Sequence, residues 1–280
     1  MSITIPSVKE LFKAGAHYGH GKSKTDARSH GNIFTYRNKV AVIDLEKTRA
    51  GLEKALEFIT SVAKEGGQFI FVGTKVQAKN QVKETAEGLN QSYVVERWPG
   101  GLLTNWDEVS KSIKKMVKIE EDLKENKYED YTKKEKLLIQ KDLDKKRMIF
   151  GGLSNLEGKP KAVIVIDAKE EQIAINEAKQ LGIEVVGVCD TNSNPNTVDY
   201  PIPANDDSQK TIDIILGLMK ETIEKNFKPK AVETDAKTGE RVEKALENKP
   251  VAVVEQEKPE NKTEKPAPKA VRKTKEAAKK

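Results

Sequence analysis

The chain contains a single cysteine, Cys189, so no internal disulfide is possible, and this indicates a reducing, intracellular setting. No apolar run approaches the roughly 20 residues that a membrane-spanning helix needs. Residues 1–10 also lack the apolar core of a signal peptide. We therefore expect a soluble cytoplasmic protein with no membrane partner.

Apolar residues are also scarce, at 36% of the 280 residues, whereas charged residues make up 34%. This balance indicates much exposed surface per residue. The net charge of +6 permits a polyanionic partner without requiring one. Residues 229–280 hold 14 basic and 10 acidic side chains, no aromatic residue and five prolines. This segment has too little apolar area to offset the entropy lost on ordering, so we expect a disordered tail. The tail is either simply solvated or weakly bound to an anionic surface.

Strand and helix patterns alternate over residues 1–228. Continuous apolar runs, typical of strands covered on both faces, predict strands at 40–43, 68–72, 93–95, 162–166 and 184–188. Helical spacing predicts helices at 45–63, 75–89 and 170–181, and a last helix after Asp206 or Asp207 that buries Ile212, Ile215, Leu216 and Met219. Such alternation predicts an α/β fold with a parallel sheet, helices on both faces and right-handed crossovers.

Residues 105–147 interrupt this alternation because they are rich in lysine and glutamate. Their apolar positions recur every three to four residues, which predicts an antiparallel helical hairpin that turns at 125–132; a single bent helix is the alternative. The α/β core then comprises residues 1–104 and 148–228. The predicted seam consists of Val109, Ile113, Met116, Leu123, Leu137, Leu138 and Leu143.

Both tryptophans of the chain, Trp98 and Trp106, flank a rigid break formed by Pro99, Gly100 and Gly101. The break follows an apolar strand and precedes the charged helical segment. Large aromatic side chains are mostly used in cores, so we expect both indoles to pack the root of the hairpin; stacking on nucleic-acid bases is the alternative. The segment gathers no acid–base, thiol or metal-ligating set.

Gly73, Thr74 and Lys75 follow a buried strand and precede a predicted helix. Free N–H groups at a helix N-terminus attract anions, so a nucleotide phosphate, an RNA phosphate or no ligand at all is compatible with this turn. The complete phosphate-loop and dinucleotide fingerprints are absent. An RNA phosphate is therefore a better interpretation here than a nucleotide.

Acidic and imidazole groups offer two further interpretations. His17 and His20 could ligate a metal together with Asp190 or Asp206, or form local hydrogen bonds only. The loops at 190–195 and 199–207 could carry catalytic carboxylates, or Asp and Asn side chains that stabilise turns. No nucleophile accompanies them, and Cys189, at the end of an apolar strand, is expected to be a buried small hydrophobe.

Basic side chains cluster in loops and on the first hairpin helix, where they could neutralise phosphates or simply form a solvated surface. The candidate RNA-binding residues are Lys22, Lys24, Arg28, Arg37, Lys75, Arg97, Lys111, Lys114 and Lys115.

Several segments, in this order, resemble one family. They are 11–20 (LFKAGAHYGH), 33–38 (IFTYRN), 43–48 (IDLEKT), 71–75 (FVGTK), 96–106 (ERWPGGLLTNW), 190–192 (DTN) and 200–207 (YPIPANDD). Over roughly residues 5–225 the chain resembles the bacterial small-subunit ribosomal protein number two family. Pro99 departs from a leucine-like residue of the family, residues 29–32 replace a more basic stretch, and the tail has no typical counterpart.

The resemblance implies a flavodoxin-like domain with an inserted coiled-coil hairpin. It also implies a structural role on the small subunit, without catalysis or cofactor. Such proteins bridge head and body through ribosomal RNA, assemble late, and help to dock the large mRNA-binding ribosomal protein one. Two other hypotheses are an enzyme that uses Gly73–Lys75 with the loops at 190–207, and an adaptor that uses the hairpin as a docking rod.

Overall fold

The computed structural model describes residues 5–156 and 158–228; the tail expected at 229–280 lies outside the described residues. Its main sheet comprises β4 (Phe69–Val72), β5 (Ser92–Val94), β6 (Ala162–Ile166), β7 (Glu184–Cys189) and β8 (Tyr200–Pro203). All neighbours pair in parallel, in the order β5-β4-β6-β7-β8. Relative to chain order this is the 2-1-3-4-5 arrangement of flavodoxin-like folds, so the predicted fold class is confirmed.

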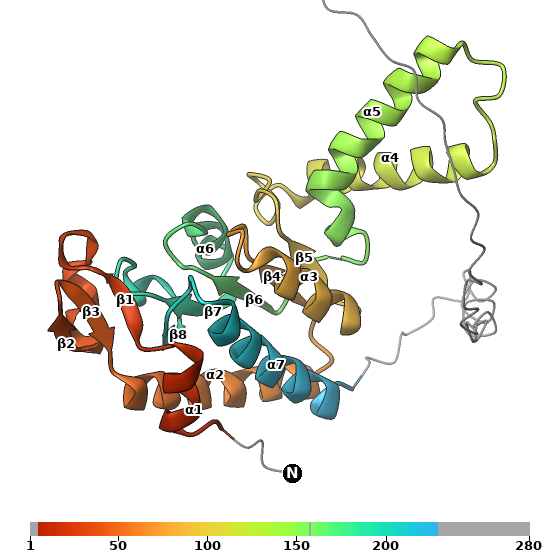
Figure 1. Ribbon diagram of the computed structural model, residues 1–280. Helices are drawn as coiled ribbons and strands as arrows, with labels where there is room; N and C mark the ends of the chain where they lie inside the picture. The colour runs from red at the N-terminus through yellow and green to blue at the C-terminus, as the bar shows by residue number, and fades with distance from the viewer. Residues whose placement is uncertain (1–4, 157, 229–280) are drawn as a thin grey trace, which may run out of the picture. The chain divides into compact units, whose positions relative to one another are not determined.

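Helices cover both faces of this sheet (Figure 1). On one face lie α2 (Leu45–Lys64), α3 (Lys79–Gly88) and α7 (Gln209–Asn226), which pack on Phe69 and Phe71. The opposite face carries α6 (Gln172–Gln180), which packs with Ile70 and Val72. Successive residues of β4 thus enter two different cores, which explains why its sequence is apolar throughout. None of the described helices is long and apolar enough to span a membrane.

A second, three-stranded antiparallel sheet precedes the main one. It follows α1 (Val8–Ala14) and has the order β1-β3-β2, with β1 (Tyr18–Gly21), β2 (Ile33–Arg37) and β3 (Val40–Ile43). The strand expected at 40–43 is present, but its assignment to the parallel sheet is wrong. Asn38 and Lys39 both have positive φ, at 50° and 64°, and form the tight turn of a β2-β3 hairpin. The alternating burial of β3 agrees with this exposed position.

The fifth parallel strand is β8, which the sequence patterns did not predict. Pro201 and Pro203 interrupt its apolar pattern, and proline cannot donate to a hydrogen-bond ladder. The strand is tolerated because β8 lies at the edge of the sheet and pairs only with β7.

Two helix starts differ from expectation. The α3 helix begins at Lys79 rather than near Lys75. The N-cap of α7 is Ser208, and neither Asp206 nor Asp207 caps it, because both carboxylates pair with the Lys75 ammonium. The expected burial of Ile212, Ile215, Leu216 and Met219 is confirmed.

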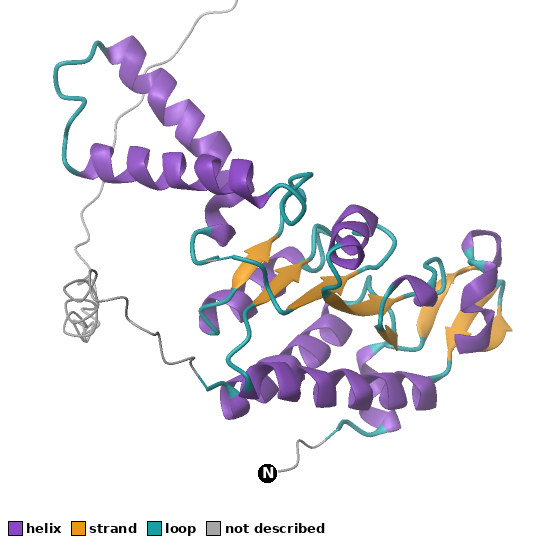
Figure 2. Cartoon of the chain, turned by 180° about the vertical axis from the view of Figure 1, so that it is seen from behind, coloured by secondary structure: helices purple, strands orange, loops and turns teal. Residues whose placement is uncertain are grey.

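Two helices lie between β5 and β6, α4 (Trp106–Lys124) and α5 (Lys133–Phe150), which rules out the single bent helix. They lie close together at their sheet end and separate toward the 125–132 loop (Figures 1 and 2). Ile113, Met116 and Leu143 are therefore buried, whereas Leu137 and Leu138 are 55% and 57% exposed. The predicted seam closes at the root only, and its extension to Leu137 and Leu138 is wrong.

The short helix η3 (Gly151–Leu153) brings the end of α5 back against β5. A Cβ atom at Gly152 would lie 2.3 Å from the backbone oxygen of Tyr93, which cannot move without displacing the strand. We expect Gly152→Ala to lower the free energy of unfolding by about 1–3 kcal/mol. Chemical denaturation followed by circular dichroism measures this.

The matched control is Gly217→Ala on α7, where a Cβ would meet nothing within 4 Å. Since alanine favours helix more than glycine does, this variant is expected to gain up to about 1 kcal/mol. A Gly152→Ala protein as stable as the wild type would contradict the close approach of η3 to β5.

Candidate nucleic-acid interface

The crevice at the carboxyl ends of β4 and β6 is the place where flavodoxin-like folds bind ligands, because the strand order reverses there. In this protein Lys75, from the loop after β4, fills it. Its ammonium lies 3.2 Å from Asp167 Oδ2, 2.5 Å from Asp206 Oδ1 and 2.7 Å from Asp207 Oδ1. The side chains of Asp167 and Asp206 are 2% and 0% exposed. The lysine thus connects the ends of three segments in the crevice.

The backbone of the same loop is also occupied. The Thr74 N–H donates to Glu171 Oε1 at 2.9 Å, and Glu171 is buried. The Thr74 N–H, a candidate donor to a phosphate, is therefore already bound to the Glu171 carboxylate. An anion that approached this turn would meet that carboxylate instead of a free N–H group. The Gly73–Lys75 turn therefore binds the protein's own acids in this structure.

Burial and charge shift the titration of this cluster. Burial, together with the neighbouring Asp167 and Asp190, raises the pKa of Asp206 to about 7. Burial lowers the pKa of Lys75, but its hydrogen bonds with Asp206 and Asp207 outweigh this effect and leave the pKa above its ordinary value. Because the lysine stays charged, it offsets part of the repulsion between the carboxylates.

His20 joins the N-terminal sheet to the end of β7. Its Nδ1 lies 3.2 Å from Asp190 Oδ2 and its Nε2 lies 3.6 Å from Asp207 Oδ2. The Asp190 carboxylate raises the pKa of His20. His17 does not join this group, since its ring stacks on Phe12 with centroids 4.1 Å apart. Among residues 5–156 and 158–228, no set of three or more His, Cys, Asp or Glu side chains is arranged to hold a metal ion.

Cys189 is buried at the end of β7, as expected. Burial raises the pKa of its thiol to about 12, so the group stays protonated and inert at neutral pH.

The break at residues 98–104 is held by one carboxylate, Glu177 of α6. It accepts hydrogen bonds from the Trp98 Nε1 at 3.1 Å, the Gly101 N–H at 2.7 Å and the Leu103 N–H at 3.0 Å. Thr104 adds longer contacts at 3.4 Å from its N–H and hydroxyl. Gly101 has φ +82°, which explains the need for glycine there. Trp98 packs the hairpin root as expected, and Trp106 is half-buried beside the same core.

Sequence patterns did not identify Glu177, because it looks like an ordinary helix residue. One signal in the sequence was that the neighbours of Glu177, Ala174 and Ala178, are apolar, as expected for a helix face that is buried. An acidic residue on such a face needs a buried donor set, and the loop after Trp98 supplies it.

Four candidate RNA-binding residues surround the three-stranded sheet. Lys22 and Lys24 form η1 (Lys22–Lys24), Arg28 lies in η2 (Ala27–Asn32), and Arg37 ends β2. The Lys22 ammonium lies 5.6 Å from the centre of the Tyr36 ring. Arg28 already forms a two-bonded ion pair with Asp26, at 2.8 and 3.0 Å, so its guanidinium is less available than the other three groups.

The other candidates lie elsewhere. Arg97 is exposed beside Trp98, and Lys75 is enclosed by the acidic crevice. On α4, Lys111 pairs with Glu108 at 2.6 Å, whereas Lys114 and Lys115 form no ion pair with any described residue. The structure therefore brings the N-terminal basic residues together and leaves the α4 lysines as a separate group.

Comparison with known proteins agrees with this architecture. The family model described as Ribosomal protein S2 matches residues 11–226. The chain is 41% identical over 250 residues to the small ribosomal subunit protein uS2 of Parabacteroides distasonis, which covers 89% of this chain and 90% of that protein. It is 41% identical over 239 residues to uS2 of Pseudoalteromonas atlantica (85% and 98%) and 42% identical over 217 residues to that of Aeromonas salmonicida (78% and 90%). The chain belongs to the ribosomal protein S2 family.

Proposed function

We propose that this protein is a structural constituent of the small ribosomal subunit, in the cytoplasm. There it binds ribosomal RNA and neighbouring ribosomal proteins at the head–body junction and supports translation. The observation that carries the proposal is the family match over residues 11–226, because this family is structural and non-enzymatic. The ion pairs of Lys75, which occupy the crevice that an enzyme of this fold would use, support the same conclusion.

RNA contact would be mainly electrostatic, through phosphates, with the protein recognising the shape of folded RNA. Lys22, Lys24 and Arg37 are the leading candidates, since they are exposed and form no ion pair with a described residue. Arg97 in the loop after β5 and Lys114 and Lys115 on α4 are further candidates, since they form no ion pair with a described residue. Arg28, Lys75 and Lys111 rank lower because they pair with carboxylates of the protein itself.

Partner proteins would include the large mRNA-binding ribosomal protein one, with the hairpin as a docking rod. Deletion of residues 108–147 is expected to abolish capture of that protein, while association with RNA survives through Lys22, Lys24 and Arg37. Loss of both activities would show that the hairpin, rather than this N-terminal basic group, is the main RNA contact.

Sedimentation of a cell lysate through a sucrose gradient tests the assignment. We expect the protein to sediment with the small subunit in low salt. If it stays at the top of the gradient, the proposed function is wrong.

The basic groups can be tested with the variant Lys22→Gln/Lys24→Gln/Arg37→Gln. Each phosphate contact contributes counterion release, so we expect weaker binding to ribosomal RNA and a log–log salt slope that is shallower by roughly 2–3. Filter binding at several salt concentrations measures both. Lys83→Gln is the control, because Lys83 is half exposed on α3 and far in sequence from the basic group. Equal salt slopes for the triple variant and the wild type would contradict the assignment of these residues.

A further inference from the structure

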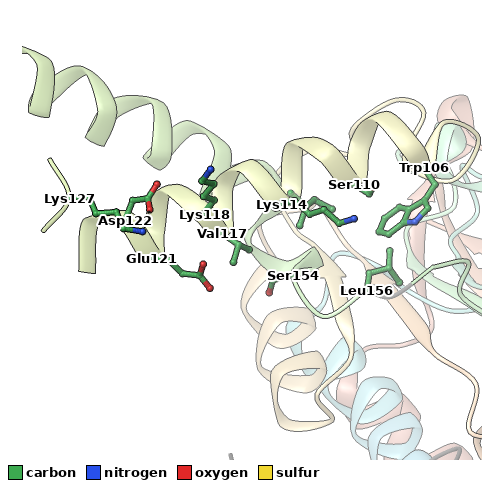
Figure 3. A pocket seen from close by; sticks show the side chains of 11 residues that line it. Trp106, Ser110, Lys114, Val117, Lys118, Glu121, Asp122, Lys127, Ser154 and Leu156 are labelled. Carbon is green, nitrogen blue, oxygen red and sulfur yellow. Dashed lines mark hydrogen bonds and ion pairs between the residues drawn. The ribbon is translucent and has the colours of Figure 1, made fainter. Parts of the chain in front are cut away.

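A groove of about 520 Å³ runs along one side of α4, between this helix and the loop before β6 (Figure 3). We call it the Trp106 groove. Its floor is apolar, since Ile113 and Leu156 are buried, and its rim carries ammonium groups together with the carboxylates of Glu121 and Asp122. The residues that matter here are Trp106, Ile113, Lys114, Val117, Lys118 and Leu156.

The two tryptophans differ in how much of the indole ring is accessible. Trp98 is 5% exposed, and its indole N–H donates to Glu177. Trp106 is only half-buried, and its indole N–H has no hydrogen-bond partner among the described residues. Figure 3 shows the Trp106 ring beside Leu156 at one end of the groove. One aromatic surface is therefore packed on the core, while part of the other remains open.

The charge along the groove is uneven. Lys114 and Lys118 are exposed and pair with no described carboxylate. At the far end, Asp122 is neutralised by Lys127 at 2.8 Å. The groove thus has an open aromatic surface at the Trp106 end, the ammonium of Lys114 and then that of Lys118 along its rim, and the carboxylates of Glu121 and Asp122 at the other end.

We propose that the Trp106 groove binds one unstacked base of single-stranded RNA. The base lies against the indole, its phosphate lies near Lys114, and the phosphates of the nucleotides that follow run along the groove toward Lys118. This inference rests on the proposed function, since it names the RNA element that one surface takes. Base–aromatic stacking beside cationic side chains is the usual way in which proteins hold unpaired nucleotides. An apolar side chain from a protein partner would fill the floor but leave the Lys114 ammonium without a counter-charge.

Fluorescence of the full-length protein tests the proposal, with a single-stranded RNA of about ten nucleotides and a duplex of the same length as probes. A stacked base quenches indole emission, so the single strand is expected to quench and the duplex is not. Trp106→Leu should weaken single-strand binding about tenfold, which corresponds to roughly 1.4 kcal/mol, and leave duplex binding unchanged. Trp106→Tyr keeps an aromatic face and should restore most of the affinity.

Lys124 provides a matched control, because it is exposed on α4, does not line the groove and is not one of the candidate RNA-binding residues. Lys114→Gln/Lys118→Gln should lower the ratio of single-strand to duplex affinity, whereas Lys124→Gln should not change it. Equal losses for both RNA forms in Trp106→Leu, or absence of quenching, would overturn the proposal.

Assembled subunits give an independent readout. With a photoreactive side chain in place of Ser110, which lines the groove, cross-linking to RNA is expected. Cross-linking to protein alone would show that a protein fills the groove and would overturn the inference. The proposed function is judged separately, since Trp106→Leu protein should still sediment with the small subunit.

Discussion

Lys75→Met is expected to lower the free energy of unfolding by about 3–5 kcal/mol at neutral pH. Methionine matches the length of lysine but removes the ammonium that lies within 3.2 Å of Asp167, Asp206 and Asp207. Two of these carboxylates are almost fully buried, so the variant leaves like charges together without a counter-charge. Urea unfolding followed by circular dichroism measures the loss.

The loss should depend on pH. The pKa of Asp206 is raised from 3.8 to about 7, so between these values the folded state binds more protons at this group than the unfolded state. Its contribution to stability is therefore present below pH 4 and lost as the pH rises through 7. Without Lys75 the carboxylates repel more strongly, so the Lys75→Met protein should regain part of its stability when the pH is lowered from 7 to 5.

Two comparisons make the test specific. Lys75→Met/Asp206→Asn removes one of the repelling charges and should recover part of the loss. Lys79→Met breaks a more exposed pair with Glu96 (side chains 28% and 34% exposed) and should cost less than about 1 kcal/mol. If Lys75→Met lowered the free energy of unfolding no more than Lys79→Met does, the ion pairs of Lys75 would not stabilise the fold. The crevice would then again be a candidate ligand site.

Glu177→Ala should have an effect of similar size, a loss of about 3 kcal/mol or more. Hydrogen bonds to charged groups contribute roughly 1.5–3 kcal/mol each, and the donors of Trp98, Gly101 and Leu103 would lose one shared acceptor. Because these donors lie in the segment between β5 and α4, the hairpin root should loosen first. Hydrogen exchange of residues 98–106 measures that local effect, and urea unfolding measures the global one.

The sign of the pH effect is opposite to that of Asp206. Burial raises the pKa of Glu177, but the N–H donors of Gly101 and Leu103 outweigh it and hold the pKa below its ordinary 4.5. A carboxylate with a lowered folded pKa contributes stability above its unfolded pKa, and this is lost as the pH falls through the folded value. The wild type should therefore lose more stability than Glu177→Gln when the pH falls below about 4.5.

Glu53→Gln serves as the reference, because Glu53 is exposed on α2 and has no hydrogen bond to a described residue. It should change the free energy of unfolding by less than about 0.5 kcal/mol. Identical stability of Glu177→Ala and Glu53→Gln would show that the loop holds its shape without Glu177.

Both predictions concern acids that bind the protein's own donors, one group in the crevice where flavodoxin-like folds bind ligands and one at the hairpin root. In the crevice, Lys75 and the Thr74 N–H are occupied by Asp206 and Glu171. At the hairpin root, Glu177 accepts hydrogen bonds from the Gly101 and Leu103 N–H groups, which could otherwise bind an anion. These hydrogen bonds and ion pairs thus occupy donors in both loops, which agrees with the structural, non-enzymatic role of the ribosomal protein S2 family.

Several features followed from the sequence alone. The pattern of apolar residues predicted β6 at 162–166 and the buried residues of α7 from Ile212 to Met219. This was possible because the spacing of apolar residues indicates whether an element is buried on one face or on both. The order of strands and helices was enough to predict a parallel sheet, and the order of short motifs was enough to indicate the family. Lack of a catalytic set was also visible without coordinates.

Features that depend on contacts between residues far apart in the sequence became clear only in the structure. Pro201 and Pro203 interrupt the apolar pattern of β8, so the sequence did not predict this strand. The strand can form because an edge strand pairs with a neighbour on one side only. Leu137 and Leu138 have helical spacing but stay exposed, because α4 and α5 separate toward their loop. Lys75 has the sequence setting of a phosphate ligand, but its ion pairs with Asp167 and Asp206, 92 and 131 positions later, form only because the fold brings these residues together. Local spacing determines which face of an element is apolar, but the partners of a charged group depend on the long-range packing that brings strand ends together.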